Sequence, residues 1–201
     1  DETTGGTGDW NTTEGEWNDT AASAQPDILA ADGQVFTNGD SVFFGLAAMG
    51  ADYSVVPNAN PNGSVSLSVE NLTFEADGVT IIAGFTGSTL AITGNLTVAS
   101  GVTSEIATKI TSGLTIANSG TLTLSGDVGT NAATDVVAIT GGTTTLSSTV
   151  NAAVTVATGT AVEVVNGGQV AGAATVAGGS LTVNDTANDA ALEVVGKTTI
   201  S

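Results

Sequence analysis

Short apolar–polar–apolar triplets recur along most of the chain, and this feature limits the possible folds more than any other. In order they are LTF (72–74), VTI (79–81), LAI (90–92), LTV (96–98), LTI (114–116), LTL (122–124), VTV (154–156), VEV (162–164), ATV (174–176), LTV (181–183) and LEV (192–194). Alternation of apolar and polar residues is the period of a half-buried strand. Gly, Asn, Asp and Ser lie between the triplets, where a chain turns. The sequence therefore predicts an all-β fold built from short strands.

The triplets also repeat at a longer spacing of 18 to 20 residues. The pairs that show it are Leu72 and Leu90, Leu96 and Leu114, Val154 and Ala174, Val162 and Leu181, and Ala174 and Leu192. A repeat of this length with two or three strands is typical of one coil of a β-solenoid. We expect the coils to stack through parallel strand pairs. The outer residues of each triplet then point into a narrow core, and the middle residue faces solvent.

Aromatic residues and prolines divide the chain into two regions. All eight aromatic residues lie at or before Phe85, and all three prolines lie before Asn62. Residues 1–63 are therefore predicted to form an irregular N-terminal cap, in which Trp10, Trp17, Phe36, Phe43 and Phe44 cover the first coil. Residues 64–201 are predicted to form a solenoid body of about seven coils, with the pattern still running at the last residue. A β-sandwich is the alternative architecture, but its core normally spreads large aromatic residues along the whole chain.

The composition excludes several classes of protein. Twenty acidic residues against only two cations, Lys109 and Lys197, give a net charge of −18. This charge opposes binding to nucleic acid and to anionic lipid. The chain has no Cys and no His, which removes disulfides, thiol catalysis and the Ser-His-Asp triad. No run of 18 apolar residues occurs, so the sequence predicts no membrane insertion by this segment.

Several stretches resemble a known family. They are the paired tryptophans of "DWNTTEGEW" (9–17), "NGDSVFF" (38–44), "VENLTFEADGVTI" (69–81) and "SGLTIANSGTLTLSGD" (112–127). The first three are similar to the N-terminal region of bacterial autotransporter passenger domains, and the last resembles the autotransporter-associated β-strand repeat. The resemblance implies a secreted, right-handed parallel β-helix. The chain departs from the repeat at Ala117 and Asn118, where the family usually has Lys or Arg, and in the "VGTNAATD" that follows Gly126-Asp127.

Few residues qualify as site candidates. Glu75 and Asp77 form a close carboxylate pair of the kind that serves glycoside hydrolysis, although we expect a solvated turn there. Asp185, Asp189 and Glu193 offer oxygen ligands that suit Ca²⁺, as a weak candidate site without a recognised calcium motif. Glu163 and Glu193 occupy the outward positions of VEV and LEV, where they favour solubility. No catalytic residue and no cofactor is predicted.

These observations favour a non-enzymatic surface protein, an adhesin-like autotransporter passenger located outside the cell or on the bacterial surface. Its expected partners are surface glycans, surface proteins or further copies of itself. The first alternative is a structural subunit of an extracellular filament or surface coat, which would use the open edges of a solenoid. The second alternative is a polysaccharide-active β-helix enzyme.

Overall fold

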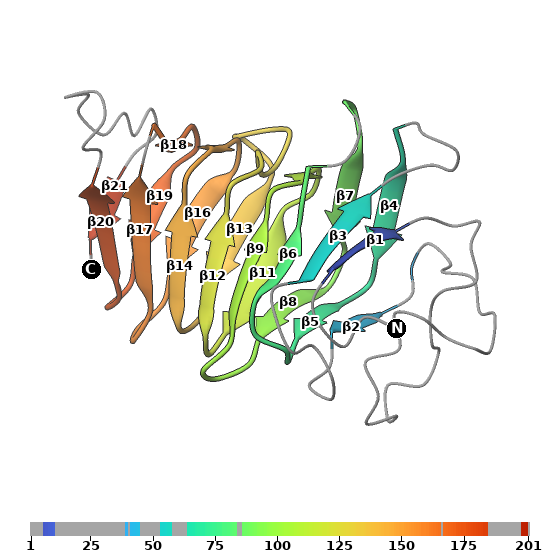
Figure 1. The fold of residues 1–201 in the computed structure, drawn as a ribbon. Coiled ribbons are helices and arrows are strands. Elements are labelled where there is room, and N and C mark those ends of the chain that lie inside the picture. Colours follow the sequence, from blue (N-terminus) through green and yellow to red (C-terminus); the bar gives the residue numbers. More distant parts are fainter. Residues whose placement is uncertain are drawn as a thin grey trace.

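The computed structural model describes residues 6–10, 39, 41–44, 53–57, 64–83, 86–165, 167–184 and 198–200. This part of the chain is all-β, and its parallel sheets stack as a β-solenoid of about six turns (Figure 1). The predicted fold class is therefore confirmed. Among these residues, no helix has the length and apolar character needed to cross a bilayer.

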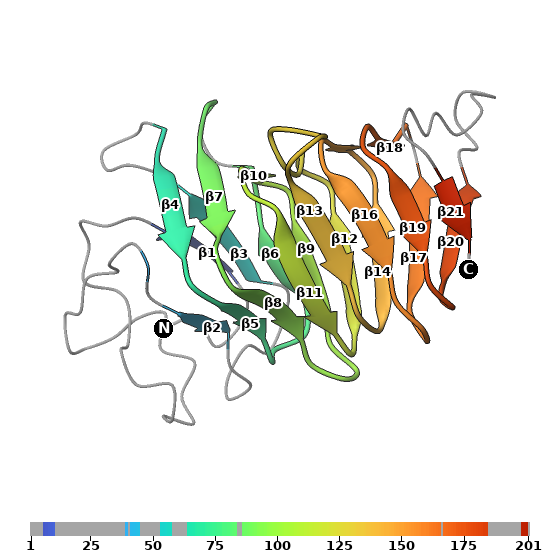
Figure 2. The ribbon, with the colours of Figure 1, turned by 180° about the vertical axis from the view of Figure 1, so that it is seen from behind.

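The strands form three parallel sheets. The front sheet faces the viewer in Figure 1 and contains β1 (Gly6–Trp10), β3 (Tyr53–Pro57), β6 (Val79–Ile81), β9 (Thr103–Ile106), β12 (Thr121–Leu124), β14 (Thr143–Leu146), β17 (Ala161–Val165) and β20 (Ser180–Asn184). The rear sheet, which faces the viewer in Figure 2, contains β2 (Val42–Phe44), β5 (Leu72–Phe74), β8 (Asn95–Val98), β11 (Leu114–Asn118), β13 (Val136–Ile139), β16 (Ala153–Val156), β19 (Ala174–Val176) and β21 (Thr198–Ile200).

The third sheet is narrower than the other two. It consists of β4 (Ser66–Val69), β7 (Thr89–Ile92) and β10 (Lys109–Ile110), followed by β15 (Thr149–Val150) and β18 (Gln169–Val170). Val128 joins the two groups through parallel bridges to Ile110 and Val150. The third side of the solenoid is therefore continuous from β4 to β18.

The chain visits the rear, front and third sheets in turn, so that β5, β6 and β7 form one coil and β8, β9 and β10 form the next. Front strands run upward in Figure 1 and rear strands run downward in Figure 2, while the chain advances from the N-terminal to the C-terminal end. This path is a right-handed coil, the hand that parallel strand connections strongly prefer.

Inward residues line up from coil to coil and form the core. One column of the rear sheet runs through Leu72, Leu96, Ile116, Ile139, Val156 and Val176, all of which are buried. Within β12, Leu122 and Leu124 are buried and Thr121 and Thr123 are partly exposed. The predicted alternation of inward apolar and outward polar residues is confirmed.

The core side chains become smaller from the N-terminal to the C-terminal end. Phe44 and Phe74 stack in successive coils, with ring centroids 5.2 Å apart, whereas the buried residues of β16 and β17 are all valines. The coil lengths do not follow this trend: Leu72 pairs with Leu96, 24 residues later, Val137 with Val154, 17 residues later, and Ala174 with Thr198, again 24 residues later.

Three of the five predicted spacings joined residues that do not pair. Leu72 stacks on Leu96, while Leu90 belongs to the third sheet, where it pairs with Leu67 and Ile110. Leu96 pairs with Ile116 in place of Leu114, and Ala174 pairs with Thr198 in place of Leu192. The pairs Val154 with Ala174 and Val162 with Leu181 are confirmed. The error arose because each coil holds three similar triplets and corner lengths vary, so a fixed spacing can reach a strand of another sheet.

Glycines at the corners let successive coils stack closely. A Cβ on Gly120 would lie 2.3 Å from the carbonyl oxygens of Ala99 and Val102 in the preceding coil, well inside van der Waals contact. Beside it, buried Asn118 accepts a hydrogen bond from the Gly120 N–H (2.8 Å) and donates from Nδ2 to the carbonyl of Thr143 (2.8 Å). The corner is thus held by the Asn118 amide on both sides.

The five predicted cap residues differ in position. Trp17 and Phe36 lie outside the described residues, and Trp10 is described only as the last residue of β1. Phe44 is buried in the core and Phe43 points outward from the same strand, β2, which pairs with β5. Residues before position 64 therefore contribute strands to the front and rear sheets. A capping role for residues 1–63 stays a prediction.

Candidate functional site

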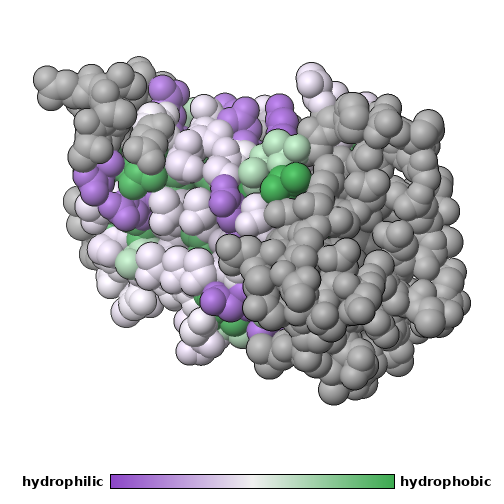
Figure 3. All heavy atoms as spheres, viewed as in Figure 1, coloured by the Kyte–Doolittle hydropathy of each residue, from purple (hydrophilic) through white to green (hydrophobic). Residues whose placement is uncertain are grey.

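The outer face of the front sheet carries polar side chains, which form two rows along the solenoid. One row is Thr103, Thr121, Thr143, Ala161 and Ser180; the other is Thr80, Glu105, Thr123, Thr145, Glu163 and Thr182. Nearly all of these residues carry a hydroxyl or a carboxylate. In Figure 3 this face is mostly pale, the colour of intermediate hydropathy, with hydrophilic side chains scattered across it.

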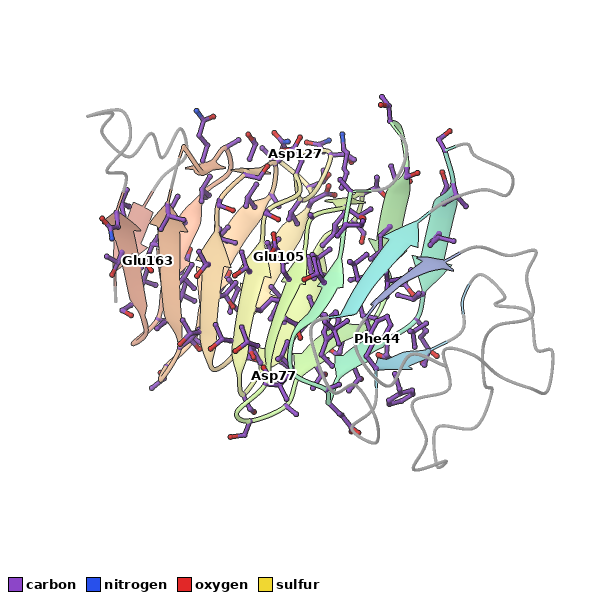
Figure 4. All side chains as sticks on the ribbon, viewed as in Figure 1. Phe44, Asp77, Glu105, Asp127 and Glu163 are labelled. Atoms are coloured by element: carbon purple, nitrogen blue, oxygen red, sulfur yellow. The ribbon has the colours of Figure 1, made fainter. Side chains whose placement is uncertain are left out.

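The two glutamates of this face lie far apart (Figure 4). Glu105 accepts a short hydrogen bond from the Ser125 hydroxyl, and Glu163 accepts one from Asn184 Nδ2 at 3.0 Å. Glu163 lies three strand spacings along the ladder from Glu105, which corresponds to about 14 Å. Carboxylate pairs that cleave glycosidic bonds are at most roughly 9.5 Å apart, so these two do not form such a pair.

A third carboxylate, Asp127, lies at the corner between the front and third sheets. Its Oδ1 accepts hydrogen bonds from the Ser148 hydroxyl at 2.5 Å and from the Thr149 N–H at 3.3 Å. Lys109 is exposed in β10, and the bridge from Ile110 to Val128 makes it the ladder neighbour of Asp127. Asp127 therefore joins one coil to the next.

The loop from Gly129 to Asp135 is an insertion at the corner that precedes β13. Asp135 Oδ2 accepts hydrogen bonds from the N–H groups of Thr130 (2.7 Å) and Asn131 (3.0 Å). These two backbone donors, first Thr130 and then Asn131, lower the pKa of the Asp135 carboxyl from its ordinary value. The carboxylate thus fixes the shape of the loop.

The carboxylate pair predicted from the sequence occupies an exposed corner after β5. Asp77 Oδ1 accepts a hydrogen bond from the N–H of Thr103 in the next coil, at 2.7 Å. That contact gives Asp77 a role in stacking the coils. Glu75 is exposed at the same corner, and its N–H donates to the carbonyl of Phe44.

The calcium candidates Asp185, Asp189 and Glu193 lie outside the described residues. In the part that the structure describes, no group of three or more acidic side chains is close enough to hold a metal ion. Glu163 points outward from the front sheet, as the VEV pattern indicated.

The outer face of the rear sheet was not recognised from the sequence. Its outward residues include Thr115, Ala138, Thr155 and Thr175 in one row, with Val136 and Ala153 in the row beside them. No charged side chain points outward from the described strands of this sheet between β2 and β19. Once the strand faces are known, the sequence itself shows that no outward position is charged in residues 113–117, 136–140, 153–157 and 173–177.

No protein-family model, curated protein or solved structure matches the chain. The assignment of the solenoid fold therefore rests on the strand pairing described above. The resemblance to autotransporter passengers stays a prediction.

Proposed function

We propose that the chain is a non-enzymatic secreted surface protein, an adhesin-like module of the autotransporter passenger type. The observation that carries the proposal is the set of long parallel ladders. They run through successive coils in register and place outward side chains in straight rows along the front and rear sheets. A stack of this kind holds many weak contact points at fixed spacing on a rigid support.

The outer rows suit contact with neutral, hydrogen-bonding surfaces such as glycans or proteins. Threonine hydroxyls both donate and accept hydrogen bonds, and the front-sheet rows repeat them in successive coils. A single hydroxyl contact contributes little net free energy. Many such contacts on one rigid face add through effective concentration, which favours adhesion by avidity.

The test is adhesion of beads that carry the full chain at known density to arrays of glycans and extracellular proteins. We expect binding to at least one surface, and we expect Thr123→Lys on the front sheet to weaken it without changing the melting temperature. Leu122, the inward neighbour, stays unchanged in this variant, so the core is not altered.

The same panel also tests the two alternatives. Release of sugar fragments from a polysaccharide would show an enzyme and contradict the proposal. Absence of adhesion together with growth of end-to-end filaments in electron micrographs would favour the structural subunit.

A further inference from the structure

The outer face of the rear sheet differs from the rest of the described surface in its charge. Its outward side chains from β2 to β19 are Phe43, Thr73, Asn95, Thr97, Thr115, Ala117, Val136, Ala138, Ala153, Thr155 and Thr175. The charged residues that the structure describes lie in the front sheet, the third sheet or the corners: Asp9, Glu70, Glu75, Asp77, Glu105, Lys109, Asp127, Asp135 and Glu163. A chain with a net charge of −18 thus keeps one broad sheet face neutral.

The same face carries the exposed hydrophobic side chains. Phe43 is 45% exposed and Val136 is 49% exposed, and they are the two large hydrophobic residues that the described part of the chain leaves in solvent. Both point outward from the rear sheet, Phe43 from β2 and Val136 from β13. Gly113 and Ala153 flank Val136 in the neighbouring coils, so no longer side chain shields it.

We propose that this face binds a second copy of the chain, with the rear sheets of the two copies packed against each other. Two copies of a strongly acidic protein repel each other, and the repulsion between their surface charges is least where neither surface carries charge. A charged partner would find no complementary group on this face. A second copy offers the same neutral, mainly small side chains, which allow two sheets to approach to about 10 Å.

The two-fold arrangement follows from identical partners. In a two-fold dimer each copy uses the same surface patch, so Val136 and Phe43 of each copy are covered by the rear sheet of the other. Burial of these exposed apolar groups supplies the hydrophobic part of the association. The threonine row supplies hydroxyls that can bond across the interface.

The size of the face predicts a weak, reversible dimer. Seven strands from β2 to β19 span about 30 Å along the solenoid axis, and four or five residues span about 15 Å along each strand. Two such faces bury roughly 1,000 Å² in total, which is the lower limit for a specific interface. We therefore expect association at micromolar or higher concentrations.

This inference rests on the proposed function in one respect, since both treat the outer faces of the sheets as contact surfaces. Adhesion to other surfaces is measured with separate beads and arrays. A monomeric protein that still adheres would overturn the dimer and leave the proposed function standing.

The test is analytical ultracentrifugation of the full chain at two ionic strengths. We expect the dimer dissociation constant to fall by about tenfold between roughly 0.01 M and 0.15 M salt, because the Debye length shortens from about 30 Å to about 8 Å and screens the repulsion. Thr155→Glu places a charge in the middle of the rear face and should raise the constant by at least about tenfold, since dimerisation would bury that charge without a partner.

Thr121→Glu is the matched control. Thr121 is also a partly exposed outward threonine at the centre of a ladder, but it lies on the front sheet between Thr103 and Thr143. Both variants add one negative charge, so they differ only in the face that carries it. Thr121→Glu should change the dissociation constant less than about twofold, and both variants should keep the strand signal in circular dichroism.

Three results would overturn the proposal: a monomer at both ionic strengths, equal weakening by the two variants, or weakening by Thr121→Glu alone. Salt-strengthened association that Thr155→Glu removes and Thr121→Glu leaves in place would support it.

Discussion

At the residue scale, the core contains hydroxyl groups at inward positions, where the alternating pattern predicts aliphatic side chains. One inward column of the front sheet runs Val79, Ser104, Leu122, Thr144 and Val162. Ser104 Oγ and Thr144 Oγ1 are buried without a hydrogen-bond partner in the described part of the chain. A buried polar group without a partner loses its hydration and gains nothing in return, so these two residues lower the stability of the solenoid.

Replacement of Thr144 by valine should therefore stabilise the protein. Thr144→Val removes the unpaired hydroxyl and keeps the shape of the side chain, so we expect a gain of about 1 kcal/mol in the free energy of unfolding, measured by urea denaturation. Thr108→Val is the control, because the buried Thr108 hydroxyl donates to the Ile82 carbonyl at 2.6 Å. That variant should lose about 1 kcal/mol. Equal losses in both variants would mean that the Thr144 hydroxyl is hydrogen-bonded in solution.

At the element scale, the sequence predicted the strands better than their pairing. Triplets such as LTI (114–116) and LTL (122–124) lie within strands, with outer residues buried and the middle threonine partly exposed. Alternation is a local property, so one strand is enough to reveal it. Pairing depends on the number of residues between strands, and this number is set by corners whose length varies. The stacking of Leu72 on Leu96 could not be read from a fixed spacing for that reason.

The alternation can be tested with one new residue at two adjacent positions. Leu124 is buried and its neighbour Thr123 points outward. Leu124→Asn should destabilise the protein by about 3–5 kcal/mol, because it removes apolar contacts and buries an amide between Ile106 and Leu146, the inward neighbours of Leu124 in the adjacent coils. Thr123→Asn should change stability by less than about 0.5 kcal/mol. Thermal denaturation of the two variants measures the difference, and similar losses would contradict the assignment of faces in β12.

The inserted loop before β13 gives a pH-dependent prediction. The pKa of Asp135 is lowered from its ordinary value of 3.8 by the N–H groups of Thr130 and Asn131. The ionised carboxylate therefore stabilises the loop fully above pH 3.8, and this contribution is lost as the pH falls through the lower pKa of the folded protein. NMR titration of the Thr130 and Asn131 amides should show a transition with a midpoint below 3.8. Asp135→Asn should abolish that transition, and a midpoint above 3.8 in the unaltered protein would argue against the hydrogen bonds.

At the scale of the whole molecule, the triplets and their spacing predicted the all-β solenoid but not the chemistry of its faces. The absence of aromatic residues after Phe85 matches the smaller core side chains of the later coils, since the stacked rings of Phe44 and Phe74 lie in the N-terminal coils. The neutral rear face could not be found from net charge, because a net charge does not say where the charged residues lie. It became visible only when the register assigned each outward residue, such as Val136 or Thr155, to a sheet.

The distribution of charge also governs how the whole molecule responds to salt. The sequence has twenty acidic residues and only two lysines. Most carboxylates therefore have no cation to pair with, and they repel one another in the compact state. Shortening the Debye length from about 30 Å to about 8 Å, by raising salt from roughly 0.01 M to 0.15 M, screens this repulsion. We expect the melting temperature to rise by several degrees over that range, as measured by calorimetry.

Dimerisation would also raise the melting temperature, so the measurement should use the Thr155→Glu variant at low protein concentration. Sucrose at equal osmolality is the control, because it carries no charge and leaves the Debye length unchanged. A melting temperature that falls with added salt would contradict this prediction, because it would mean that attractive ion pairs outweigh the repulsion. With two lysines and no arginine, the chain has few residues that can form such pairs.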